Sequence, residues 1–240
     1  MKLIRLDSTD STNTRAFHYL DQFDSVVVIA GAQSEGRGRG ENRWESPPGN
    51  IYLSVGKTLD THCLRGLSVR VATHLASDLA PLLKGKKLRV KWPNDLYLTD
   101  KKVAGILTES KIMSGKARVV AGIGLNIAIA PLENSTILSE LATINNEEVE
   151  QLLVEAILAA FSDMDFVSLG KKLRELSWFD AGDHIRFLEN GSPVSALFEG
   201  YDQNLAMIVR MNNENRTITV SEVSRFRKNS VSESSCASKE

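Results

Sequence analysis

Two spacings of apolar residues alternate along the first 180 positions of the chain. Short runs that are continuously apolar, or that alternate with polar residues, predict strands, whereas apolar residues at helical spacing predict helices. Strands are expected at residues 3–6, 25–32, 51–55, 88–92, 95–98, 103–109 and 117–129. Helices are expected after Asp10–Asn13, over 64–82, over 147–161 and over 168–178. This mixture predicts an α+β fold with a mixed β-sheet flanked by helices.

The character of the sequence changes after Trp178. Short strands are expected at 183–188, 194–200, 206–211 and 216–220, with Asn190-Gly191 and Asn212-Asn213 as turns between them. This pattern predicts a small all-β barrel of about fifty residues, near the lower size limit for independent folding. Residues 230–240 are rich in serine and charged side chains, which predicts disorder. We therefore expect a large domain at 1–179, a barrel at 180–228 and a disordered tail at 229–240.

Charge and cysteine content narrow the class of protein. The 29 Lys and Arg residues nearly balance the 30 Asp and Glu residues, which gives a net charge of −1 and argues against an extended nucleic-acid-binding surface. Cys63 and Cys236 form neither a disulfide framework nor a metal-ligand spacing. Neither a secretory signal nor an apolar run of membrane-spanning length is visible. A cytoplasmic location without a membrane partner is expected.

A glycine-arginine loop follows the strand expected at 25–32. It reads Gly36-Arg37-Gly38-Arg39-Gly40, and Trp44 comes shortly after it. Glycine lets a backbone approach a ligand closely, and arginine carries a planar cation that suits phosphate or carboxylate, so the loop is typical of an anion site. The alternative is a mobile basic loop of the RGG kind that contacts nucleic acid. The loop lacks the GK[ST] ending of a P-loop, and it does not open a helix as a dinucleotide-binding GxGxxG does.

Four other segments carry polar residues where strands end or lie buried. They are Asp10–Asn13, Lys91-Trp92-Pro93-Asn94-Asp95, Lys101–Leu107 and Ala121–Ile127. Each has a plain structural interpretation: a helix cap, a tight turn, a solvated turn, and a buried strand whose Asn126 has structural hydrogen-bond partners. Together with Trp44 they supply cations, hydrogen-bonding side chains and an apolar plane on which a purine could stack. This combination favours a site for a polyphosphate and a carboxylate.

These motifs, in this order, resemble those of biotin–protein ligases. The matching segments are DSTNT (10–14), Gln33, GRGRG with Trp44 (36–44), KWPNDLYL (91–98), KKVAGIL (101–107) and AGIGLNI (121–127). The resemblance covers about residues 1–180. It implies a catalytic domain like that of class II synthetases, followed by an SH3-like barrel. Glu41-Asn42 stands where bacterial relatives often have Gly-Arg, so the usual second nucleotide-side arginine is absent; Arg43 could replace it only with a shift in register.

The resemblance implies a ligase that works in two steps. Biotin is activated by ATP and Mg²⁺ as biotinyl-5′-AMP, and the biotinyl group then passes to a lysine of a biotin carboxyl carrier protein. The implied catalytic residues are Lys91, Arg39 and Lys102. The implied biotin-binding residues are Ser11, Thr12, Asn13, Gln33, Gly36, Arg37, Gly38, Arg39 and Lys102. The implied ATP-binding residues are Arg39, Trp44, Lys91, Asn94, Lys102 and Asn126, and no metal ligand is identified.

Two other functions stay open at this point. A lipoate–protein ligase shares the fold and the adenylation chemistry, but KWPND and Gln33 favour biotin, because a ureido ring needs polar partners that a dithiolane does not. A non-catalytic nucleic-acid-binding module is disfavoured by the net charge of −1. No helix-turn-helix precedes the first expected strand, so the resemblance implies a short form without the DNA-binding domain and no DNA partner is expected. A monomer and a homodimer are both compatible with the sequence.

Overall fold

The structure consists of two compact units. The computed structural model describes residues 1–220 and 223–228. The first unit comprises Met1–Trp178 and the second comprises Phe179–Glu240. All of the motifs discussed above lie in the first unit, and the expected disordered tail lies outside the described residues.

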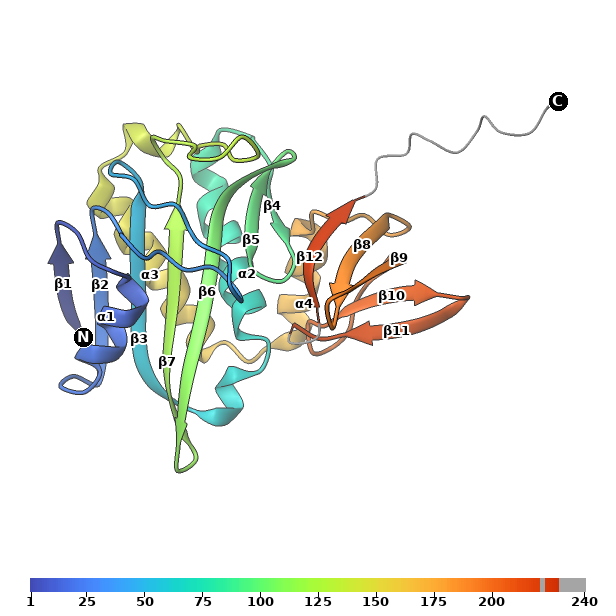
Figure 1. Cartoon of the computed structure of the whole chain (residues 1–240), viewed down its shortest axis with the longest axis horizontal. Coiled ribbons are helices and arrows are strands. Elements are labelled where there is room, and N and C mark those ends of the chain that lie inside the picture. Colours follow the sequence, from blue (N-terminus) through green and yellow to red (C-terminus); the bar gives the residue numbers. More distant parts are fainter. Residues whose placement is uncertain (221–222, 229–240) are drawn as a thin grey trace. The chain divides into compact units, whose positions relative to one another are not determined.

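The first unit is built around one seven-stranded sheet (Figure 1). The strand order is β1-β2-β3-β7-β6-β5-β4, and only β1 and β2 pair in parallel. The strands are β1 (Lys2–Leu6), β2 (Ser25–Ala30), β3 (Ile51–Asp60), β4 (Leu88–Lys91), β5 (Asp95–Leu98), β6 (Lys101–Met113) and β7 (Lys116–Leu125). All seven expected strands are present, and β3 and β6 are longer than the sequence pattern predicts. Ser114 and Gly115 both have positive φ and join β6 to β7, as a tight hairpin turn requires.

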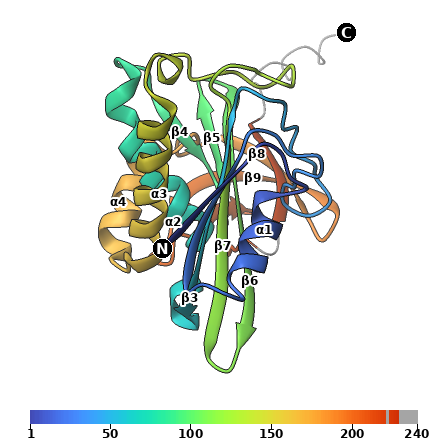
Figure 2. The same cartoon turned by 90° about the vertical axis from the view of Figure 1, so that its left-hand side faces the viewer.

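Helices cover both faces of this sheet (Figure 2). They are α1 (Thr12–Tyr19), α2 (Leu67–Leu79), α3 (Asn146–Ser162) and α4 (Phe166–Leu176), with short 3₁₀ turns at Thr61–Leu64, Ala80–Leu83 and Leu141–Thr143. Helix α1 lies on one face, and α2 and α3 lie on the other. The expected helix over 64–82 is therefore only partly α-helical: Gly66 in the left-handed conformation precedes α2, and Pro81 lies in the 3₁₀ turn that follows it.

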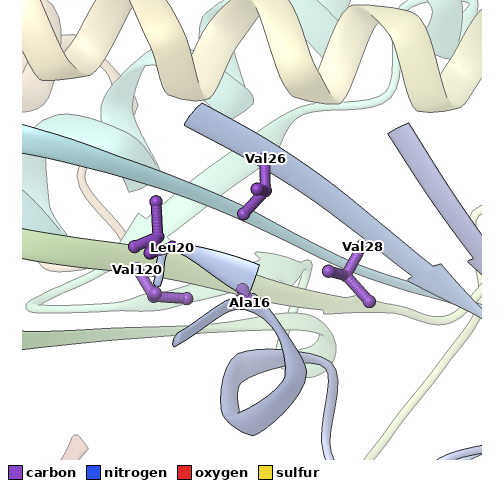
Figure 3. Close-up of a cluster of buried hydrophobic side chains, with 5 residues drawn as sticks. All are labelled: Ala16, Leu20, Val26, Val28 and Val120. Atoms are coloured by element: carbon purple, nitrogen blue, oxygen red, sulfur yellow. The ribbon is translucent and has the colours of Figure 1, made fainter. Parts of the chain in front are cut away.

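Helix α1 is held on the sheet by a small apolar cluster (Figure 3). Ala16 and Leu20 pack against Val26, Val28 and Val120, and all five side chains are buried. Ser11 precedes α1 but makes no capping hydrogen bond with its side chain, contrary to the simple cap interpretation of this segment. Burial of this apolar face, rather than capping, therefore accounts for the position of the helix.

The second unit is a small antiparallel sheet of five strands in the order β11-β10-β9-β8-β12. The strands are β8 (His184–Glu189), β9 (Ser192–Tyr201), β10 (Met207–Met211), β11 (Glu214–Ile218) and β12 (Val223–Lys228). This unit is compatible with the expected SH3-like barrel. Strand β12 was not expected, because its sequence, Val-Ser-Arg-Phe-Arg-Lys, is mostly polar. Its pairing with β8 is a tertiary contact that a local pattern does not report.

Candidate active site

The sheet face that carries α1 also carries a floor of glycines. One row of directly opposed residues crosses five strands there, in the order Tyr52, Gly124, Gly105, Asp95 and Lys91. Directly opposed residues point to the same face of a sheet. A Cβ atom at Gly105 would lie 2.9 Å from Trp44 Cζ3, and one at Gly124 would overlap Trp44 Nε1. The indole of Trp44 therefore lies flat on two glycines, where any larger residue would displace it.

The indole nitrogen of Trp44 is an unused hydrogen-bond donor. Trp44 Nε1 is buried and has no acceptor among the residues that the structure describes. A buried donor without a partner is rare in proteins, and a bound ligand is one of the groups that can supply its acceptor. The floor beneath the indole is thus suited to an extended or planar ligand with a polar atom.

One end of the glycine floor is lined by a chain of hydrogen-bonded side chains. Gln33 Oε1 accepts a hydrogen bond from the Thr12 backbone N–H at 2.8 Å, and Gln33 Nε2 donates to Ser46 Oγ at 2.9 Å. The fully buried Ser54 Oγ lies 2.8 Å from Thr12 Oγ1 and 2.7 Å from Asn13 Oδ1. This polar end offers both donors and acceptors, so it is suited to a neutral group that has both.

The other end of the floor carries the cations. Lys102 Nζ lies 2.7 Å from Asp95 Oδ1 and 5.0 Å from the centre of the Trp44 ring. Burial lowers the pKa of the Arg39 guanidinium, and the negative charge of Asp95 opposes that shift. Lys102 and Arg39 therefore both lie in the field of the Asp95 carboxylate, and cations of this kind are suited to an anionic ligand.

Lys91 and Asn94 lie beside this cationic end. Lys91 is directly opposite Asp95 in the sheet, so it belongs to the same face. Its Nζ lies 3.1 Å from Tyr97 Oη and 4.9 Å from the ring centre of Trp178. Asn94 Nδ2 donates to the Ile106 carbonyl at 2.8 Å, which fixes the end of β5 against β6.

Asn126 makes structural hydrogen bonds. It is 1% exposed, its Oδ1 accepts from Asn50 Nδ2 at 3.3 Å, and its Nδ2 donates to the Thr136 carbonyl at 3.3 Å. Asn50 Oδ1 in turn accepts from the backbone N–H groups of residues 127–129 at 3.0–3.1 Å. The pair holds the segment after β7, which agrees with the structural interpretation of Asn126.

The glycine-arginine loop folds into a short hairpin of its own. Gly38 N–H donates to the Asn42 carbonyl at 2.7 Å, and Trp44 N–H donates to the Gly36 carbonyl at 2.9 Å. Asn42 Nδ2 donates to the Arg39 carbonyl at 2.7 Å. A Cβ at Gly36 would overlap the Trp44 carbonyl oxygen, so glycine is required there. Asn42 thus stabilises the turn through its side chain.

Arg37 and Arg43, which lie opposite each other in this hairpin, bond to the protein itself. Arg37 Nη2 donates to Glu109 Oε2 at 3.0 Å, and Arg43 Nη2 donates to the Ser34 carbonyl at 3.1 Å. Arg37 therefore lies at the polar end of the floor, because Glu109 also accepts a hydrogen bond from Asn13. The structure divides the glycine-arginine motif between the two ends.

The structure adds site residues to which the sequence interpretation assigned no role. They are Ser46, Asn50, Ser54, Asp95 and Glu109. Ser54 could have been found from the sequence, because it is the one polar residue in the run 51–55 at the start of β3. Nothing in the sequence points to Glu109, because an acidic residue in an alternating strand is expected to face solvent. Among the expected residues, Ser11 is buried at 3% exposure, and its backbone N–H donates to Asp10 Oδ1 at 2.8 Å.

A family profile matches the part of the chain that carries this site. The profile is that of the Biotin/lipoate A/B protein ligase family, and it matches residues 4–126. The chain belongs to this family. The polar end, the glycine floor and the cationic end all contain residues from the matched segment.

Curated relatives agree with this family. The chain is 41% identical over 133 residues to the bifunctional ligase/repressor BirA of Escherichia coli strain K12, a match that covers 53% of this chain and 41% of that relative. It is 37% identical over 131 residues to the biotin–[acetyl-CoA-carboxylase] ligase of Paracoccus denitrificans, covering 52% of this chain and 55% of the relative. The match thus spans about half, or less, of the length of these relatives.

Solved structures share the fold of the family. A biotin protein ligase from Aquifex aeolicus, solved in complex with biotin and ATP, superimposes with a TM-score of 0.78 at 23% identity, covering 95% of this chain and 99% of the other. Within the described residues, no helix is both long and apolar enough to cross a membrane. Across the same residues, no three His, Cys, Asp or Glu side chains are grouped as a metal site would require.

Proposed function

We propose that this protein is a biotin–protein ligase that activates biotin as biotinyl-5′-AMP and transfers it to a lysine of a biotin carboxyl carrier protein. The observation that carries the proposal is the order of three parts along one face of the sheet: polar side chains, a glycine floor and cations. Biotin has the same order, with a ureido ring, an apolar chain and a carboxylate. Relatives with named biotin ligase activity support the assignment.

The head of biotin suits the polar end. A ureido ring carries two N–H donors and one carbonyl acceptor. The buried side chains of Thr12, Asn13 and Ser54 and the partly buried side chain of Gln33 offer both kinds of partner. Buried polar groups require matched partners, so this end favours a ureido ring over an apolar dithiolane. The same argument favours biotin over lipoate as the substrate.

The first chemical step suits the cationic end. A carboxylate oxygen of biotin attacks the α-phosphorus of ATP, the bond to the β-phosphate bridging oxygen breaks, and pyrophosphate leaves. Two anions must be brought together for this attack, so fixed cations are needed. Lys102 and Arg39 are assigned to the junction between the carboxylate and the α-phosphate, and Lys91 is assigned to the α-phosphate as it is transferred. Mg²⁺ enters with ATP as part of the nucleotide complex and shields the departing pyrophosphate.

The second step releases AMP. The amine of the carrier lysine attacks the carbonyl carbon of the mixed anhydride, and AMP leaves from that carbon. Because the anhydride reacts with water, it must be covered until the carrier arrives. The hairpin at residues 36–44 is assigned this covering role. Trp44 would leave the glycines when the ligand binds and would then contact the adenosine part of the adenylate.

A single transfer assay tests the proposal. The protein is incubated with ATP, Mg²⁺, a biotin carboxyl carrier domain and either biotin or lipoate, and the mass of the carrier is measured. A biotin-sized increase that depends on ATP supports the proposal. Transfer of lipoate alone would identify a lipoate ligase, and no transfer together with tight RNA binding would identify a nucleic-acid-binding module.

A further inference from the structure

Glu109 lies at the centre of a hydrogen-bonded group, and the proposed chemistry gives this carboxylate no role. Its Oε2 atom accepts from Asn13 Nδ2 at 2.7 Å and from Arg37 Nη2 at 3.0 Å. The Glu109 side chain is 28% exposed and that of Arg37 is 46% exposed, whereas Asn13 is only 3% exposed. One carboxylate on β6 therefore connects α1 to the glycine-arginine hairpin.

The carboxylate determines which way the Asn13 amide points. Asn13 Nδ2 faces two acceptors, Glu109 Oε2 at 2.7 Å and the Leu107 carbonyl at 3.2 Å. If the amide were reversed, Asn13 Oδ1 would face these two oxygen atoms and the hydrogen bonds would be replaced by repulsion. The nearer of the two acceptors is charged, so Glu109 contributes the larger part of this preference.

The fixed amide presents an acceptor to the glycine floor. Asn13 Oδ1 lies directly over Gly122, because a Cβ at Gly122 would overlap it. It lies 2.7 Å from Ser54 Oγ, which can donate one hydrogen. A carbonyl oxygen has two lone pairs, so one remains for a ligand N–H.

We propose that Glu109 is a specificity-determining positioning residue: it holds Asn13 so that Oδ1 accepts a hydrogen bond from a ureido N–H of the substrate. This inference rests on the proposed biotin ligase function. Arg37, on the hairpin, also donates a hydrogen bond to this carboxylate. The orientation of the Asn13 amide at the polar end therefore depends on the position of the hairpin.

Calorimetric binding of biotin to the full chain tests this role. In Glu109→Ala, the Kd for biotin is expected to rise about tenfold, the effect of one weakened hydrogen bond. In Glu109→Gln, the amide oxygen can accept from Asn13 in the same place, so most of the affinity is expected to return. Glu35→Ala removes an exposed carboxylate near the hairpin and serves as the matched control, with an unchanged Kd.

A double-mutant cycle separates positioning from general damage. If Glu109 acts through Asn13, the Glu109→Ala change has no further effect on the Kd in an Asn13→Ala background. Biotin derivatives methylated on either ureido nitrogen give a second measurement. The parent protein is expected to discriminate against one of them, and both single variants lose that discrimination.

The outcomes distinguish this inference from the proposed function. If the parent protein fails to transfer biotin at all, the proposed function fails. If the parent transfers biotin but the effects of Glu109→Ala and Asn13→Ala on the Kd are additive, or Glu109→Gln is as weak as Glu109→Ala, the positioning role is wrong. Thermal unfolding of each variant checks that the fold is retained.

Discussion

Removing the charge of Lys102 tests the cationic end of the site directly. Lys102 and Asp95 form an ion pair at 2.7 Å, with side chains only 26% and 22% exposed. Substituting the lysine alone would leave a largely buried carboxylate without its partner, which is itself destabilising. The variant is therefore Lys102→Met combined with Asp95→Asn, which removes both charges and keeps similar side-chain volumes.

The expected loss follows from the strength of one charged hydrogen bond. Such bonds contribute about 1.5–3 kcal/mol, so the Kd for biotin is expected to rise by about tenfold to about a hundredfold. Biotinol, in which a hydroxymethyl group replaces the carboxylate, lacks the charge that Lys102 is assigned to bind. Its Kd is expected to change by less than about threefold, the effect of a neutral contact.

Calorimetric titrations with biotin and biotinol test whether Lys102 binds the carboxylate. Lys101→Met serves as the control, because Lys101 is the exposed neighbour of Lys102 and carries the same charge. Its binding of biotin is expected to match that of the parent protein. Equal weakening of biotin and biotinol in the double variant would refute the assignment of Lys102 to the carboxylate.

Three further predictions concern other parts of the first unit. In Gly124→Ala, the new methyl group overlaps the indole of Trp44, so we expect red-shifted tryptophan emission in the free protein, and unchanged emission would contradict the placement of Trp44. The same methyl occupies the floor on which the ligand is proposed to lie, so biotin binding is expected to weaken at least about tenfold, as overpacking of about 1–3 kcal/mol implies. Burial raises the pKa of Tyr52 to about 12, although its hydrogen bond with Asn50 lowers it. The neutral phenol is thus favoured by folding, so its contribution to stability is complete below the unfolded pKa of about 10 and is lost as the pH rises through the folded value. An ultraviolet titration of phenolate is expected to lose its highest component in Tyr52→Phe, and an unchanged titration would show that another tyrosine is responsible. Arg70 is fully buried and donates to backbone carbonyls, so Arg70→Met is expected to lower the free energy of unfolding by about 3 kcal/mol in urea; a change below about 0.5 kcal/mol would show that these carbonyls find other partners.

Much of the first unit could be predicted because its elements have strong local patterns. Apolar runs such as residues 25–30 form strands that are buried on both faces. The helix expected over 64–82 was too long, because apolar spacing alone does not report where α-helical hydrogen bonding gives way to a 3₁₀ turn. Strand β12 was missed, because it is defined by pairing with β8 and not by its own composition.

The candidate site was predictable in its residue types and less so in its arrangement. The motifs around Gly36–Gly40 and Lys91–Asp95 indicated cations and close backbone approach. They did not indicate that Arg37 would pair with Glu109 or that Lys102 would pair with Asp95, since each partner is distant in sequence or belongs to another strand.

The sequence by itself determined the fold class, which is α+β, and the presence of a loop in which glycine is required. Periodicity, turn chemistry and charge are local properties, because they depend only on residues that are neighbours in the sequence. What only the tertiary structure decided was the order of the parts along one face. The register of β7 with β3 and β6 aligns Gly122 and Gly124 with Ser54 and Gly105. That register depends on hydrogen bonds between distant strands, so it places the polar end, the floor and the cations in one line only when the whole sheet is formed.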